Sequence, residues 1–78
     1  MPKLVPITAS ALIRILKRLG FEEVRIRGSH HFFIHPLSNK STTVAVHSGE
    51  VLGVGILKII LRDVDLSVKE YEKHRLRR

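Results

Sequence analysis

The 78-residue sequence predicts a small α+β domain in which helices cover one face of a three-stranded antiparallel sheet. Three observations support this prediction. Apolar residues recur at helical spacing near the N-terminus, alternating or β-branched segments fill the middle of the chain, and helical spacing returns after residue 53. The middle segments are joined by short turns, which connect antiparallel neighbours. The predicted order is α-β-β-β-α, followed by a short extra helix at the C-terminal end.

The first helix is predicted over residues 9–19. Thr8 precedes it as the N-cap, because its hydroxyl can accept a hydrogen bond from a free N–H group of the first turn. Gly20 follows it as a helix-ending residue. Its apolar face consists of Leu12, Ile15, Leu16 and Leu19. We expect this face to pack against the sheet.

The three strands are predicted over residues 23–27, 30–35 and 42–47. The turn Gly28-Ser29 joins the first two strands, and a six-residue loop, 36–41, joins the second and third. The polar and apolar alternation of the first strand is typical of a strand with one buried face.

Strand pairing places the histidines. A symmetric hairpin around the loop pairs His30 with His47, on the open face of the sheet that points away from the helices. Their Cβ atoms would then lie about 5 Å apart. The other face is expected to meet the helices with Val24, Ile26, Val44 and Val46.

Two helices are predicted after the sheet. The first covers residues 54–62, and its apolar face consists of Ile56, Leu57, Ile60 and Leu61. The second is short and begins at Ser67, with Glu70 in the position that completes a capping box.

Much of the positive charge lies at the C-terminal end. Fourteen Lys and Arg against seven Asp and Glu give a net charge of +7. Four of the cations, Lys73, Arg75, Arg77 and Arg78, fall in the last six residues. We therefore predict one domain over residues 1–72 and a basic tail over 73–78. A basic tail attracts polyanions such as RNA, although a solvated, frayed helix end would have the same composition.

The chain contains no cysteine, which excludes disulfides and cysteine-based zinc sites and agrees with a reducing compartment. No apolar run approaches the ~20 residues of a membrane span. The first six residues also lack the apolar stretch of a signal peptide. We therefore expect a cytoplasmic protein.

Five histidines are many for a chain of this length. Paired imidazoles can act as base and acid, because they exchange protons near neutral pH. Histidines that pack in a strand or bind backbone are the structural alternative, and a zinc site is a third. No predicted helix carries two histidines at the spacing of zinc ligands, and acids are few nearby, so we expect no metal or other cofactor. His30 and His47 are the catalytic candidates.

Several segments together carry a family resemblance. They are the helix ending in Leu19-Gly20-Phe21, the run Arg27-Gly28-Ser29-His30-His31 followed by His35-Pro36, the strand Thr43-Val44-Ala45-Val46-His47, and Leu57 to Leu61 followed by Leu66-Ser67. They resemble the HicA (YcfA-like) mRNA interferase toxins of type II toxin–antitoxin systems. The resemblance implies a double-stranded-RNA-binding-domain-like fold, ribosome-independent mRNA cleavage and a HicB-type antitoxin. It places the catalytic histidine at His30 and the turn glycine at Gly28.

The combined expectation is an RNA endonuclease that uses no metal. His30 takes the proton of a ribose 2′-OH, and His47 is the candidate donor to the leaving oxygen. The expected RNA-binding residues are Gly28, Ser29, Arg25, Arg27 and Lys40. The expected partner is an acidic HicB-like antitoxin that covers the open face beside Phe32 and Ile34 and blocks His30.

Two other functions fit parts of the sequence. A non-catalytic double-stranded-RNA-binding module would grip duplex RNA by its shape. Such modules typically carry a lysine cluster at the start of the final helix, whereas residues 54–60 contain only Lys58. A pure interaction protein would use Phe32 and Ile34 to dock its partner.

Overall fold

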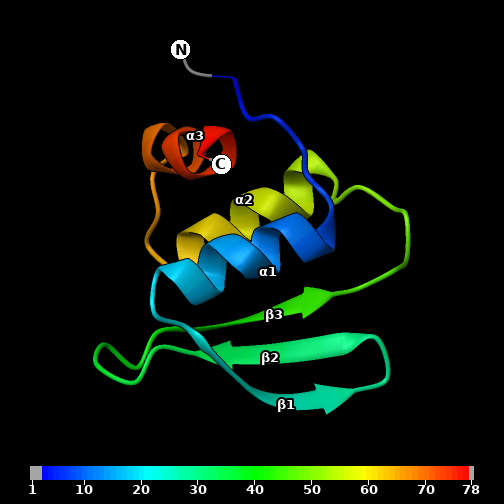
Figure 1. Ribbon diagram of the computed structural model, residues 1–78, viewed down its shortest axis with the longest axis vertical. Helices are drawn as coiled ribbons and strands as arrows, with labels where there is room; N and C mark the ends of the chain where they lie inside the picture. The colour runs from blue at the N-terminus through cyan, green and yellow to red at the C-terminus, as the bar shows by residue number, and fades with distance from the viewer. Residues whose placement is uncertain (1–2, 78) are drawn as a thin grey trace.

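The computed structural model describes residues 3–77. Its elements are α1 (Ala9–Arg18), β1 (Glu22–Arg27), β2 (His30–Ile34), β3 (Ser41–Ala45), α2 (Val54–Asp63) and α3 (Val68–Leu76). The strands form one antiparallel sheet in the order β1-β2-β3. The α+β class and the predicted element order are therefore confirmed. Figure 1 shows β3 next to α1 and α2, β1 at the far edge of the sheet, and α3 on the other side of the two central helices.

Local signals place α1 as predicted. The Thr8 hydroxyl accepts a hydrogen bond from the Ala11 N–H group at 3.2 Å, which caps the helix. Its inward residues Leu12, Ile15 and Leu16 are buried. Leu19, at the C-cap, is only partly buried but packs against the same core.

The core lies between the helices and the inner face of β2 and β3. Phe33 and Val44 are buried there, as is Thr42. Because Thr42 brings a hydroxyl into this layer, it needs a partner. It donates a hydrogen bond at 3.0 Å to Asp63 on α2, which ties β3 to the end of that helix.

β1 contributes no buried residue to the core, so the prediction for Val24 and Ile26 is wrong. These side chains are 59% and 57% exposed. Pairing with β2 shifts between Glu23 and Arg25, so Val24 occupies a β-bulge. Ile26 stands opposite His31 on the inner face, but the helices pack over β3 and do not reach this far. Alternation in the sequence therefore predicted a strand, but not its position at an uncovered edge.

The hairpin of β2 and β3 has a different register from the predicted one. His30 pairs with Ala45 rather than with His47, and β3 ends at Ala45. The cause is a shorter loop: the His35 N–H donates to the Lys40 carbonyl at 2.8 Å, leaving four residues, 36–39, in the turn. Asn39 closes that turn with φ of 61°. Because the slip is two residues, every side chain stays on its predicted face.

The second and third helices differ in detail from the prediction. α2 buries Leu57, Ile60 and Leu61, whereas Ile56 is 53% exposed, contrary to expectation. At about 100° per residue, Ile56 is turned a quarter of the circumference away from the centre of the buried stripe. Ser67 caps α3 by accepting a hydrogen bond from the Glu70 N–H group at 3.1 Å.

α3 is anchored by Tyr71, which is fully buried. Its hydroxyl donates a hydrogen bond to the carbonyl of Val5, near the start of the chain. The helix continues to Leu76, so the cations Lys73 and Arg75 lie within its last turns. Among residues 3–77, no helix is long and apolar enough to cross a membrane.

Candidate catalytic site on the open sheet face

The uncovered face of the sheet carries most of the predicted site residues. β2 is the central strand, with β1 and β3 on either side. His30 stands opposite Arg27 on β1 and opposite Ala45 on β3. Two positions along, Phe32 stands opposite Arg25 and Thr43. Opposed residues share a face, so the pairing set by the turn at residues 28–29 puts Arg27 beside His30 and Arg25 beside Phe32.

The turn before His30 depends on Gly28. This residue has φ of 60°, whereas Ser29 is not among the residues with positive φ. A glycine with positive φ at the first position of a two-residue hairpin turn is typical of type II′. A Cβ atom added at Gly28 would meet no atom within 4 Å. The requirement for glycine is therefore conformational, and the exposed backbone leaves room for a phosphate.

Ser29 connects the turn to the third strand. Its carbonyl accepts a hydrogen bond from the Val46 N–H group at 2.7 Å, beyond the end of β3. This bond brings His47, the next residue, toward the turn end of the sheet. His47 is exposed and lines a hollow of about 130 Å³ with Glu50 and Ile56. It therefore lies beyond the strand and is not cross-strand paired with His30 as predicted.

Arg25 is held on the open face by an aromatic ring. Its guanidinium carbon lies 5.6 Å from the centroid of Phe32, within the range of a cation–π interaction. Phe32 and Ile34 are half-buried rather than fully exposed. They line a hollow of about 540 Å³, to which Val24 and Ile59 also contribute. Phe33 and Thr42 of the inner face line it as well, so the hollow lies between the sheet and α2.

The structure does not bring Lys40 into the site. It lies in the loop after β2, while Gly28 and His30 lie at the other end of that strand. At about 3.3 Å per residue, the five residues of β2 separate the two ends by roughly 16 Å. The Lys40 ammonium forms an ion pair with Asp65 at 3.0 Å. Its position favours a contact with the α2–α3 connection.

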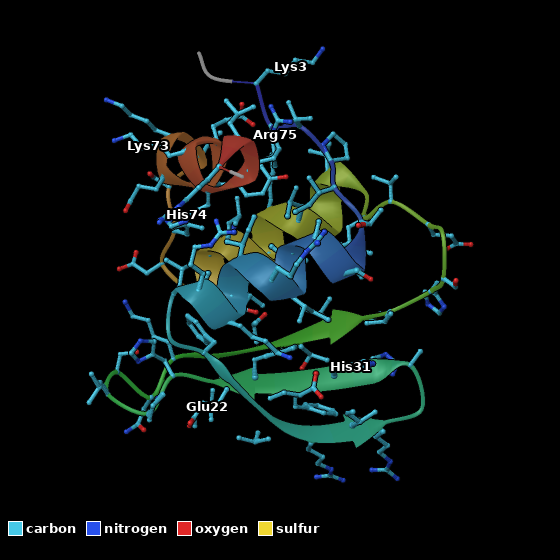
Figure 2. All side chains as sticks on the ribbon, in the orientation of Figure 1. Lys3, Glu22, His31, Lys73, His74 and Arg75 are labelled. Atoms are coloured by element: carbon cyan, nitrogen blue, oxygen red, sulfur yellow. The ribbon has the colours of Figure 1, made fainter. Side chains whose placement is uncertain are left out.

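The neighbouring strand histidines have structural partners. The Nδ1 atom of His31 lies 3.0 Å from a Glu23 carboxylate oxygen. The Nδ1 atom of His35 accepts from the Leu37 and Ser38 N–H groups, and its Nε2 atom lies 3.2 Å from the Leu19 carbonyl. His31 is labelled on β2 in Figure 2.

His30 and His47 differ from those two. Both are exposed, and neither side chain makes a hydrogen bond within the part of the chain that the structure describes. Their imidazoles are free to meet a ligand, whereas those of His31 and His35 already hold the sheet edge and the hairpin loop.

Sequence analysis missed two features of this surface. The stacking of Arg25 on Phe32 depends on the pairing of these two residues across β1 and β2, which the two-residue turn sets. The contribution of Ile59 to the hollow was detectable, because α2 carries more aliphatic residues than one face can bury. Within residues 3–77, no three His, Asp or Glu side chains lie close enough together to hold a metal ion.

The fold and this surface define a small α+β domain with an exposed histidine on a basic, uncovered sheet face. The family model described as the HicA toxin of bacterial toxin–antitoxin systems matches residues 9–66, which include α1, the whole sheet and α2. The chain therefore belongs to the HicA toxin family. A comparison with curated proteins finds no match. α3 lies outside the matched segment.

Proposed function

We propose that this toxin is an mRNA endonuclease that acts without the ribosome and uses His30 for proton transfer. The observation that carries the proposal is the position of His30. Its imidazole is free on the open face, it follows the Gly28 turn, and Arg27 stands opposite it. A nuclease site needs a proton acceptor next to groups that bind phosphate.

The proposed reaction is an intramolecular transesterification, in which a phosphodiester of the RNA is transferred from the 5′-oxygen to the neighbouring 2′-oxygen. His30 accepts the proton of a ribose 2′-OH, and the resulting oxygen attacks the adjacent phosphorus. The bond from phosphorus to the 5′-oxygen breaks, and that oxygen takes up a proton. The products are a 2′,3′-cyclic phosphate and a 5′-hydroxyl end, so atoms and charge balance. His47 is the candidate donor, because it lies near the turn end of the same sheet.

Cations and the glycine turn would hold the phosphates. Arg25 and Arg27 project from the same face as His30, and each can donate two hydrogen bonds to a phosphate. A phosphate can come close to the backbone of Gly28 and Ser29, because Gly28 has no side chain to block it. Lys40 remains a proposed contact only for RNA long enough to reach the other end of β2.

The test is cleavage of single-stranded RNA by the purified protein in the presence of EDTA. His30→Ala should lower the rate by at least about 10²-fold, since a general acid–base group contributes about 10²–10⁴-fold. His31→Gln is the matched control, because it changes the next histidine on the opposite face. RNA with 2′-deoxy substitutions should remain intact. If His30→Ala cleaved RNA at the rate of the wild-type protein, the assignment of His30 would be refuted. If the wild-type protein bound RNA without cleaving it, the double-stranded-RNA-binding alternative would be favoured.

We further propose that an acidic HicB-like antitoxin covers this face and blocks His30. The half-buried Phe32 and Ile34 provide an apolar centre on this face, and the two arginines of β1 provide a charged rim. Burial of the apolar centre mainly determines the dissociation rate of the complex, while the opposite charges of the two partners raise the association rate. Phe32→Ala should weaken the complex by more than about 1 kcal/mol. Binding that is unaffected by Phe32→Ala and leaves RNA cleavage intact would contradict this arrangement.

A further inference from the structure

A second cationic cleft lies between α1 and α3. Its volume is about 440 Å³. Arg14 and Arg18 enter it from α1, His74 and Arg75 from α3, and Arg77 from the C-terminal end of that helix. Ile7, which precedes α1, and the apolar residues Ala11 and Ile15 of α1 complete its lining. None of its lining residues comes from the sheet, and Figure 2 shows His74 and Arg75 on α3, away from His31 on β2.

The charge of this α1–α3 cleft is mostly unneutralised. Arg75 is paired with Glu72 through two hydrogen bonds, of 2.6 and 2.9 Å. Among the described residues, the other three arginines form no ion pair, and no acidic side chain lines the cleft. Three guanidinium groups therefore converge on one concave surface. Like charges so placed repel one another and favour an anion between them.

His74 adds a separate sign of a missing partner. Its Nδ1 atom is buried and, within residues 3–77, has no hydrogen-bond partner. A buried polar atom left unpaired destabilises the fold. His74 lines the cleft, and Arg18 donates to its carbonyl at 3.3 Å, which joins α1 to α3 beside this unpaired atom.

We propose that the α1–α3 cleft binds phosphate groups of the RNA backbone. These phosphates would belong to nucleotides outside the stretch of RNA that lies at His30. Guanidinium groups match phosphate oxygens in pairs, and several of them hold phosphate more firmly than they would a single carboxylate. The inference rests on RNA being the substrate. The α1 wall of this cleft lies within the matched residues 9–66, whereas the α3 wall belongs to the part of the chain that the family match does not cover. The cleft provides an anchor for RNA that extends beyond the open face of the sheet.

The test compares two triple variants that lose equal charge. Arg14→Gln, Arg18→Gln and Arg77→Gln change the cleft. Lys17→Gln, Lys58→Gln and Lys69→Gln change exposed cations that do not line it. Binding of a long single-stranded RNA with 2′-deoxy substitutions is measured over a range of salt concentrations, and circular dichroism verifies that each variant is folded.

The cleft variant should bind the long RNA at least about tenfold more weakly. The slope of the logarithm of the binding constant against the logarithm of salt concentration should become shallower by about 2, since three phosphate contacts with a single strand are lost. The control should keep most of the affinity, and a trinucleotide should bind all three proteins equally. Cleavage by the cleft variant should show a raised KM with little change in kcat.

Equal losses in the two triples would overturn the proposal, because net charge alone would then explain the effect. The proposal would also be overturned if the cleft variant bound RNA normally but no longer bound the antitoxin, because the cleft would then be a binding site for a protein. The proposed function fails separately. If the wild type cuts no RNA but the cleft triple still binds RNA more weakly than the control, the cleft stands and the endonuclease proposal falls.

Discussion

β1 and β3 flank the same central strand, but only β3 is covered by helices. Val44 on β3 is completely buried, whereas Ile26 on β1 is 57% exposed although it shares the inner face. The two neighbouring phenylalanines of β2 repeat this contrast across the sheet. Phe33 is buried in the core, and Phe32 lies half-buried on the open face beside Arg25. The covered half holds the fold, and the uncovered half is available for ligands.

The largest expected effect separates the two phenylalanines. Phe33→Ala should lower the free energy of unfolding by about 3–5 kcal/mol, because it removes a fully buried ring. Phe32→Ala should lower it by less than half as much, since its ring is already partly in water. Urea denaturation measures both. Similar losses in the two variants would mean that the open face is part of the core.

The second prediction concerns two glycines with positive φ, one in each half. Gly20 has φ of 100°, and a Cβ atom there would lie 2.9 Å from the Nε2 atom of His35. Gly20→Ala should therefore cost about 1–3 kcal/mol from strain and crowding. At Gly28 an added Cβ atom would meet no other atom, so Gly28→Ala should lower the free energy of unfolding by less, about 1–2 kcal/mol. Thermal unfolding of both variants provides the comparison, and a larger loss at Gly28 would contradict it.

A smaller effect is expected from Tyr71, which joins the end of the covered half to the start of the chain. Tyr71→Phe removes the hydrogen bond to the Val5 carbonyl and should cost about 1 kcal/mol at neutral pH.

The effect of Tyr71 should also depend on pH. Burial raises the pKa of the Tyr71 hydroxyl. The folded state then keeps this proton more tightly than the unfolded state, so the stabilisation is complete below about pH 10 and is lost above it. The difference between wild type and Tyr71→Phe should narrow as the solution becomes alkaline. Chemical denaturation at several pH values checks this, and a constant difference would show that the hydroxyl does not titrate with unfolding.

The smallest effect is expected on β1. Ile26→Thr should change the free energy of unfolding by no more than about 0.5 kcal/mol, since the side chain is mostly exposed and threonine suits a strand. Val44→Thr, on the covered side of the same sheet, is the matched control and should be clearly destabilising. A loss at Ile26 equal to that at Val44 would place β1 in the core.

The features that sequence analysis predicted correctly depend on neighbours along the chain. The Thr8 cap, the buried stripe of α1 and the turn at Gly28 all follow from local chemistry. The faces of β2 and β3 were also correct, because alternation determines which side a residue takes. Register depends on how the loop closes, and the His35–Lys40 pairing made that loop shorter than its composition suggested.

The features that were missed depend on packing between distant segments. Whether Val24 and Ile26 are buried depends on how far the helices extend across the sheet, which no strand encodes by itself. The exposure of Ile56 follows from the direction in which α2 packs. At the candidate site, His30 and the two arginines lie on one face as expected, but His47 and Lys40 were displaced by the same register change and loop geometry.

The position of β1 at the uncovered edge of the sheet has a consequence for amide hydrogen exchange. β1 pairs only with β2 and buries no side chain, so it can open without disrupting the helical core. Its amides should exchange with solvent faster than those of β3. Each opening would carry Arg25 and Arg27 away from His30 while leaving the β2–β3 hairpin intact. Protection of β1 on adding a ligand would therefore report that the arginines have been held in place beside the histidine.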